Sequence, residues 1–176
     1  MTIIDYEIIP IHSGSIRVTV RNSKEETPQR VLDKMDLESI TICNLTYLNQ
    51  YSIDVKQHIS DFNKMFNNLN QKVVGYGASG RAGIFCSMTE LDVDDIEFIV
   101  DESPQRCGRY LSGTKIPIVD LEHLKNSKVD VIFIFAWNYS KMIIEKTKHL
   151  NCKYLVVFPT VQLVESYEEL KGFESI

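Results

Sequence analysis

The stretch "KVVGYGASGRAGIFC", Lys72–Cys86, decides the fold class of this chain. It is an apolar run followed by three glycines, Gly75, Gly77 and Gly80, with the spacing G-x-G-x-x-G. This pattern is typical of a strand, a tight turn and a helix whose N-terminus faces a phosphate group. We expect Gly75 to permit the turn, Gly77 to let the backbone approach a ligand, and Gly80 to let helix and strand pack closely.

Strands and helices alternate after this stretch. Apolar runs predict buried strands at residues 72–75, 96–100, 129–135 and 154–158, and helical patterns separate them. Such alternation indicates a mostly parallel sheet that is covered by helices on both faces. We therefore expect an α/β fold with a Rossmann-like sheet over residues 71–176.

Two other patterns precede the predicted sheet. Residues 3–9 are rich in β-branched side chains, and apolar and polar residues alternate over 16–20, which predicts an N-terminal β-hairpin. From Val31 to about Gln71, apolar residues recur at helical spacing and predict one long amphipathic helix, which packs on its own domain or on a partner. Residues 1–70 are thus expected to form the hairpin arm and the long helix, in one compact unit with the sheet.

Composition and charge exclude several classes of partner. The chain has 176 residues, a formal net charge of −5 and no cluster of Lys and Arg, so we expect no nucleic-acid partner. No apolar run reaches the roughly 18–20 residues of a membrane span, and the first residues lack the features of a signal peptide, which favours a cytoplasmic protein without a membrane partner. The four cysteines are scattered, so no metal site is expected.

The glycine pattern leaves more than one function open. Free backbone N–H groups at a helix start favour an anion. Asp101 closes the next predicted strand, where the acid of a dinucleotide-binding enzyme would bind a ribose 2′-hydroxyl. NAD binding therefore fits the spacing, although the chain has little room for a substrate domain. A purely structural turn is the other interpretation of these residues.

Four stretches together resemble a known family. They are "IPIHSGSIRV", "VVGYGASGRAG", "FIVDESPQRCGRYLSGTKIPI" and "FIFAWNY". In order and spacing they resemble the C-terminal domain of bacterial nucleotide-sugar C-methyltransferases, over about residues 3–160. The resemblance implies a three-part enzyme: a small zinc module, a central S-adenosylmethionine-binding domain and a C-terminal Rossmann-like domain.

The chain departs from the pattern of that family at several positions. Ser13 replaces the first glycine of H-G-G-S, Arg81 and Arg106 stand where the family has lysines, and Ser112 stands where proline is common. An arginine keeps the charge of a lysine but changes its shape from a point to a planar fork. These departures bear on the identity of the substrate rather than on the fold.

The resemblance implies that this chain is the substrate-side, sugar-nucleotide-binding domain of such an enzyme. The methyl-donor domain that the resemblance implies is not part of this sequence, so we expect the chain to bind no cofactor, S-adenosylmethionine included, and to be inactive alone. Its expected partners are a nucleotide-sugar substrate and an S-adenosylmethionine-binding methyltransferase domain, in cis or in trans. The alternative is a non-catalytic nucleotide- or NAD-binding Rossmann module.

His12 is the candidate catalytic residue. The resemblance associates this histidine with the general base that forms an enolate, and the near-neutral pKa of histidine suits that task. A turn histidine without a chemical role is the alternative. The candidate substrate-binding residues are Ser15 and Arg17 beside it, Gly75, Tyr76, Gly77, Ala78, Ser79, Gly80 and Arg81 of the glycine loop, Arg109, and Trp137 with Asn138.

Each of these substrate-binding candidates has a structural alternative. Arg17 could simply be solvated, and Arg109 could form a surface ion pair. The ring of Tyr76 could stack on a ligand or pack in the core. Asn138 follows a predicted strand, where ligands of open α/β sheets bind, but its amide could also cap the strand end.

Overall fold

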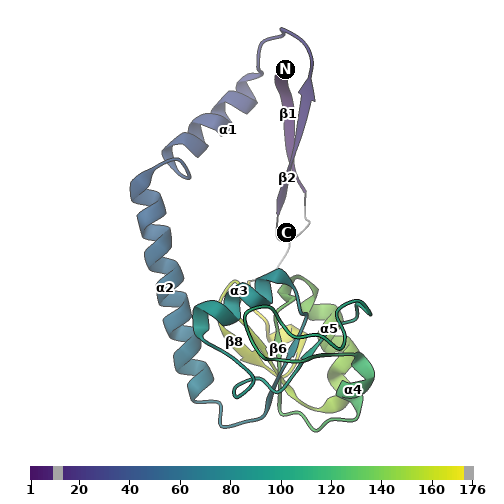
Figure 1. Cartoon of the computed structure of the whole chain (residues 1–176). Coiled ribbons are helices and arrows are strands. Elements are labelled where there is room, and N and C mark those ends of the chain that lie inside the picture. Colours follow the sequence, from purple (N-terminus) through teal and green to yellow (C-terminus); the bar gives the residue numbers. More distant parts are fainter. Residues whose placement is uncertain (10–13, 173–176) are drawn as a thin grey trace. The chain divides into compact units, whose positions relative to one another are not determined.

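The computed structural model describes residues 1–9 and 14–172 (Figure 1). The chain forms two compact units, and the boundary between Gln57 and His58 falls inside helix α2 (Leu45–Asn67). Unit 1 is the part before this boundary and unit 2 is the part after it. Within the described ranges, no helix is both long and apolar enough to cross a membrane.

Unit 2 contains a six-stranded sheet in the order β5-β4-β3-β6-β7-β8. All neighbouring strands are parallel except the antiparallel pair β7 and β8. The mostly parallel α/β sheet predicted from the sequence is therefore confirmed. The strands are β3 (Val73–Tyr76), β4 (Ile99–Val100), β5 (Ile118–Val119), β6 (Val131–Ile134), β7 (Lys153–Val156) and β8 (Gln162–Val164).

The sequence pattern missed the two edge strands of this sheet. β5 has two residues and β8 has three, which is too short for a run that periodicity can detect. The predicted strand at residues 96–100 is also shorter than expected, because only Ile99 and Val100 are strand residues of β4. The backbone still continues the ladder before β4, where the N–H of Gly75 donates to the carbonyl of Phe98.

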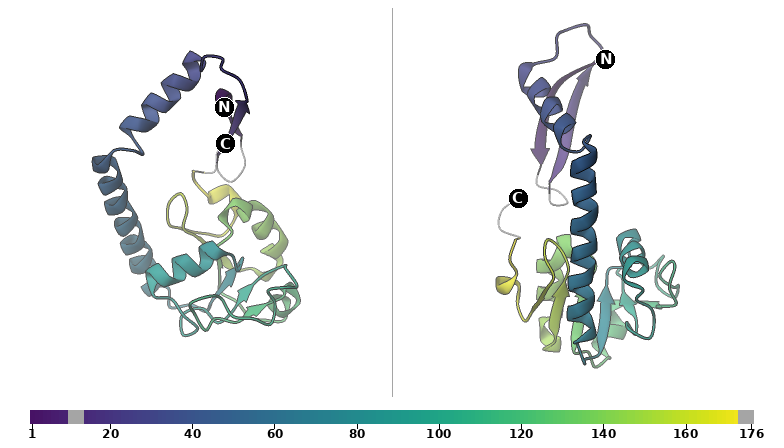
Figure 2. Two further views of the ribbon diagram at one scale, coloured as in Figure 1. Left: turned by 45° about the horizontal axis from the view of Figure 1, so that its top comes forward. Right: turned by 90° about the vertical axis from the view of Figure 1, so that its left-hand side faces the viewer.

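Helices cover both faces of the sheet (Figure 2). The second half of α2 and helix α3 (Gly80–Thr89) pack on one face, and helices α4 (Leu121–Lys125) and α5 (Ser140–Thr147) pack on the other. Consecutive strand residues such as Val73 and Val74 join different core clusters, as the two-residue period of a strand requires. Short 3₁₀ helices complete the unit: η1 (Trp137–Tyr139), η2 (Lys148–Leu150) and η3 (Tyr167–Glu169).

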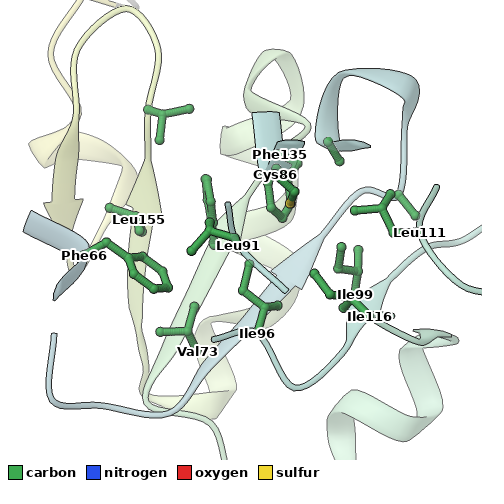
Figure 3. Packing of buried hydrophobic residues seen from close by; sticks show 14 of the residues in the cluster. Phe66, Val73, Cys86, Leu91, Ile96, Ile99, Leu111, Ile116, Phe135 and Leu155 are labelled. Atoms are coloured by element: carbon green, nitrogen blue, oxygen red, sulfur yellow. The ribbon is translucent and has the colours of Figure 1, made fainter. Parts of the chain in front are cut away.

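Aromatic rings attach α2 to its face of the sheet. Phe62 is fully buried and lies 4.8 Å from Phe85 of α3 and 5.4 Å from Phe133 of β6, measured between ring centroids. Burying an aromatic ring of this size contributes a large share of core stability. Figure 3 shows the same layer around Val73 and Phe135. These contacts place residues 58–67 with the sheet.

The single long helix predicted over residues 31–71 is wrong. The structure has two helices, α1 (Gln29–Ile40) and α2, separated by residues 41–44. Thr41 turns its hydroxyl back to the carbonyl of Leu37, and the side chain of Asn44 accepts a hydrogen bond of 2.9 Å from the backbone N–H of Thr46. Asn44 therefore caps the N-terminus of α2, a role for which asparagine is well suited.

Unit 1 contains the paired strands β1 (Thr2–Ile9) and β2 (Ser15–Arg21), which are antiparallel. Ile8 faces Ile16 and Tyr6 faces Val18, while the opposite face carries the ion pair between Arg17 and Glu7. Ile8, Ile16 and Val18 are all exposed. Among the described residues of unit 1, Val31 is the single buried hydrophobic side chain. This unit therefore leaves an apolar strand face in solvent.

Two of the three glycines, Gly75 and Gly80, do not have the roles that their spacing predicted. Gly75 lies inside β3, where an added Cβ would come within 2.6 Å of Ile99 and 2.9 Å of Phe135, so this glycine serves packing rather than the turn. The turn residue is Gly77, with a φ of +97°. An added Cβ at Gly80 would meet no atom within 4 Å, so Gly80 is not needed for close packing.

These two glycines give a matched test of the packing. Gly75→Ala should destabilise the fold by about 1–3 kcal/mol, because the added methyl group overpacks the sheet. Gly80→Ala should change the free energy of unfolding by less than about 0.5 kcal/mol, because its new side chain reaches open space. Urea unfolding followed by circular dichroism measures both. Equal destabilisation by the two changes would contradict this packing.

Candidate functional site

The candidate site lies at the carboxyl ends of the parallel strands, where ligands of open α/β sheets bind. The chain leaves β3 through Gly77, whose N–H donates to the carbonyl of Val100 at 2.8 Å. A side chain at Gly77 would lie 2.7 Å from the Cβ of Ala136, which follows β6. The ends of β3 and β6 thus touch, and the left-handed backbone of Gly77 turns the chain toward α3.

Asp101 connects the glycine loop to the loop after β4. Its carboxylate accepts hydrogen bonds from the N–H of Ala78 at 2.8 Å, the N–H of Ser103 at 2.9 Å and the guanidinium of Arg106 at 3.0 Å. The side chain is 8% exposed. Both carboxylate oxygens are engaged by the chain itself, which gives Asp101 a structural role in place of the ribose contact of the dinucleotide interpretation.

An open groove of about 600 Å³ lies between α3 and the loop after β4. Ala78, Ser79 and Gly80 line it from the glycine loop, and Arg109 lines it from the other side. The loop comes close to the helix at Gly83, where an added Cβ would lie 3.2 Å from the carbonyl of Ser112. Four of the predicted substrate-binding residues therefore share one groove.

The charge of this groove differs from that of its neighbour. Two arginines, Arg106 and Arg109, and no carboxylate occur among its lining residues, while Ile84, Met88 and Leu111 provide an apolar wall. An adjacent pocket of about 460 Å³ is instead lined by acids: Asp101, Glu102, Asp120 and Glu122. An anionic ligand is favoured in the groove and disfavoured in the acidic pocket.

The N-terminus of α3 lies at the groove. Ser79 precedes the helix, and its hydroxyl is buried without a hydrogen-bond partner in the described part of the chain. The first N–H groups of a helix have no intrahelical acceptor and carry the positive end of the helix dipole. This end of the groove therefore suits a group that accepts hydrogen bonds.

Tyr76 is buried on the opposite side of the sheet from this groove. Its hydroxyl donates to Glu102 at 2.6 Å, and the ammonium of Lys146 contacts both oxygens of Glu102 at 2.7 and 2.8 Å. Burial, followed by the hydrogen bond to Glu102, raises the pKa of Tyr76. The hydrogen bonds from Lys146 and then Tyr76 lower the pKa of Glu102. Tyr76 and Gly77 also line a smaller pocket of about 270 Å³.

Arg81 and Trp137 meet in the structure. The guanidinium carbon of Arg81 lies 4.7 Å from the ring centroid of Trp137. Asn138 follows in η1, and its side chain is partly buried. Residues from the starts of α3 and η1 thus lie together at the carboxyl edge of the sheet.

The remaining predicted residues belong to unit 1 or lie outside the described ranges. Ser15 and Arg17 are on β2, and Arg17 forms its ion pair with Glu7 on the neighbouring strand. His12, the predicted base, lies outside the described residues. In the described ranges, no group of three or more His, Cys, Asp or Glu is placed to bind a metal.

Three residues at this edge of the sheet are not among the candidates that the sequence indicates. Glu102 and Lys146 are 44 positions apart, so no local pattern could pair them. Phe158, which packs on Trp137 with ring centroids 5.6 Å apart, lies inside the predicted strand 154–158. In the structure β7 ends at Val156, and the side chain of Phe158 is exposed beyond it.

The fold and this edge of the sheet define an α/β domain with an arginine-lined groove at the N-terminus of a helix. The chain belongs to the C-methyltransferase C-terminal domain family, whose model matches residues 10–159. It is also similar to the C-methyltransferase NovU of Streptomyces niveus, with 27% identity over 101 residues. The match covers 56% of this chain and 24% of NovU, so it spans about a quarter of that relative.

The network around Glu102 predicts a specific pH dependence of stability. Since the folded-state pKa of Glu102 is lowered, its contribution is present above the ordinary value of about 4.5 and is lost as the pH falls through the folded pKa. Glu102→Gln should therefore lower the Tm at pH 7, and the difference from the wild type should shrink below pH 4.5. Thermal unfolding followed by circular dichroism, repeated at several pH values between 3 and 8, measures the difference in Tm at each pH.

Lys146→Met serves as the matched variant, because it removes the largest cause of the lowered pKa of Glu102. Lys146→Met should lower the Tm at pH 7 as Glu102→Gln does, and it should make the Tm less dependent on pH below pH 4.5. A difference in Tm that stayed constant down to pH 3 would show that the charge of Glu102 does not stabilise the fold.

Proposed function

We propose that this chain is the substrate-side, sugar-nucleotide-binding domain of an S-adenosylmethionine-dependent sugar C-methyltransferase, with a Rossmann-like sheet. Membership of the C-methyltransferase C-terminal domain family supports the place of the chain in such an enzyme. The observation that carries the substrate class is the groove at the N-terminus of α3, which is lined by Arg106 and Arg109 and by no carboxylate among its lining residues. A diphosphate is the part of a sugar nucleotide that such a groove would bind.

The proposed binding mode divides the ligand between two kinds of wall. The diphosphate would accept hydrogen bonds from the start of α3 and from Arg109, which is exposed and can move toward it. The apolar wall formed by Ile84 and Leu111 would contact the less polar parts of the ligand. Arg106 is already bonded to Asp101, so it would shape the groove and contribute charge rather than reorient.

The NAD-binding alternative has less support from the geometry. The acid that would bind the ribose, Asp101, is buried and accepts three hydrogen bonds from the chain. A ribose hydroxyl would have to compete with the N–H groups of Ala78 and Ser103. We therefore favour a ligand that is held by its diphosphate and does not depend on this carboxylate.

We propose that a separate domain binds the methyl donor, in cis or in trans. The chain spans about a quarter of NovU, which leaves most of that relative unmatched. Unit 1 exposes Ile8, Ile16, Val18 and Val20 on one face of its two-stranded sheet. Exposed apolar strand faces of this kind are typical of surfaces that bind another protein or domain. The donor-binding domain is the partner that the family implies.

His12 is proposed as the general base of the complete enzyme, a role supported by the sequence resemblance alone. With the donor domain supplied, His12→Ala should lower turnover by roughly 100- to 10,000-fold, the usual contribution of a positioned base. His12→Asn should be nearly as damaging, because an amide accepts no proton at neutral pH. The decisive measurement is solvent deuterium exchange beside the ketone of the substrate without methyl donor. Normal exchange in His12→Ala would assign the base to another residue.

Calorimetric titration of the isolated chain tests the substrate class. Deoxythymidine diphosphate should bind saturably, whereas NAD and S-adenosylmethionine should give no binding heat. Arg109→Gln should weaken the nucleotide roughly 10-fold, the equivalent of one charge-assisted hydrogen bond of about 1.5 kcal/mol. Lys125→Gln, which removes a charge from α4 on the other face of the sheet, is the control and should change nothing. Tight binding of NAD or of S-adenosylmethionine would overturn the proposal.

A further inference from the structure

Three planar groups lie close together at the carboxyl edge of the sheet. The guanidinium of Arg81 lies 4.7 Å from the ring centroid of Trp137, and the ring of Phe158 lies 5.6 Å from that same ring at an interplanar angle of 32°. We call these three residues the stack. They come from the start of α3 after β3, from η1 after β6 and from the residues after β7. The strands β3, β6 and β7 are neighbours in the sheet.

The inner part of the stack is fixed and its outer parts are accessible. Trp137 is partly buried and packs against both core clusters, so the core sets the position of its ring. Phe158 is 44% exposed, and Arg81 is exposed as well. An exposed ring and an exposed guanidinium that both lie close to one tryptophan are accessible to a ligand. The stack offers flat faces to a ligand at the edge where ligands bind.

Arg81 has no carboxylate partner among the ion pairs of the described residues. Its described contact is the ring of Trp137, an interaction that a ligand ring can replace at similar strength. Arg81 also directly follows Gly80, which lines the groove at the N-terminus of α3. The groove and the stack therefore involve adjacent residues at the start of α3.

We propose that the stack is the nucleobase-binding platform of this domain, an inference that rests on the proposed binding of a nucleoside diphosphate in the groove. The base displaces the guanidinium of Arg81 from the ring of Trp137 and packs against Trp137 and Phe158, so a ligand without a ring leaves the contact between Arg81 and Trp137 in place. Stacking tolerates different bases because every base has a flat π-face. The platform thus orients the nucleotide through shape, and it adds Phe158 to the residues that recognise the substrate.

The chain contains one tryptophan, Trp137, so its intrinsic fluorescence reports on the stack directly. The full chain is titrated with deoxythymidine diphosphate, with inorganic pyrophosphate and with thymidine, and calorimetry is run on the same samples. Deoxythymidine diphosphate should quench or shift the Trp137 emission saturably. Pyrophosphate should bind in the groove without the same change, because it has no ring.

Two variants separate the ring from the charge. Phe158→Leu keeps an apolar side chain but removes the ring, and it should weaken deoxythymidine diphosphate roughly 5-fold or more, as expected for loss of base stacking, while pyrophosphate binding is unchanged. Arg81→Lys keeps the cation but cannot stack flat, so the emission of the free protein should change. Tyr51→Leu, an exposed aromatic side chain of unit 1, is the control and should match the wild type.

The outcomes distinguish this inference from the proposed function. Deoxythymidine diphosphate that binds in calorimetry with no change in Trp137 emission, and with equal affinity for Phe158→Leu, would overturn the platform and leave the proposed function intact. An equal emission change with pyrophosphate would also overturn it, because the stack would then respond to anions alone. Absence of any nucleotide heat would overturn the proposed function together with the platform.

Discussion

The carboxylate of Asp101 is the interaction on which the candidate site depends. A buried carboxylate is unfavourable unless hydrogen bonds or charges replace its water. Here the N–H groups of Ala78 and Ser103 and the guanidinium of Arg106 do so, and they belong to the two loops that border the groove. One buried charge thereby fixes the distance between the glycine loop and the loop after β4. The charge-assisted bond to Arg106 also keeps that arginine at the groove.

Close packing between β3 and β6 determines where a ligand can lie. From β3 the chain adds β4 and β5 on one side of the sheet, and from β6 it adds β7 on the other side. The helices α3 and α5, which follow β3 and β6, cover opposite faces. A crevice would normally open there. In this chain, Gly77 and Ala136 approach so closely that an added Cβ would lie 2.7 Å from the Cβ of Ala136. The contact leaves space on either side of it, in the groove beside α3 and in the smaller pocket beside α5.

The sequence predicted the parts of the fold that depend on local patterns. Long apolar runs identified β3, β6 and β7, because strands that are buried on both faces need continuous apolar residues. The break between α1 and α2 was missed, since a helical stripe continues across residues 41–44 and only the capping role of Asn44 reveals the turn. At the site, Arg81 could be named from the glycine loop and Trp137 from the stretch that ends the third predicted strand. The pairing of Tyr76 with Glu102, by contrast, depends on long-range packing that periodicity does not encode.

One of the departures from the family pattern bears on how this chain builds the edge of its sheet. Arg81 and Arg106 stand where the resemblance expects lysine, and the structure uses the planar guanidinium at the first position. An ammonium could donate to Asp101 as Arg106 does, but only a planar guanidinium can stack on an aromatic ring such as that of Trp137, whose centroid lies 4.7 Å from the guanidinium carbon of Arg81. The substitution at Arg81 therefore replaces a point charge beside the glycine loop with a planar cation close to the ring of Trp137, which in turn packs on Phe158. Charge and planar shape are thus combined at the start of α3.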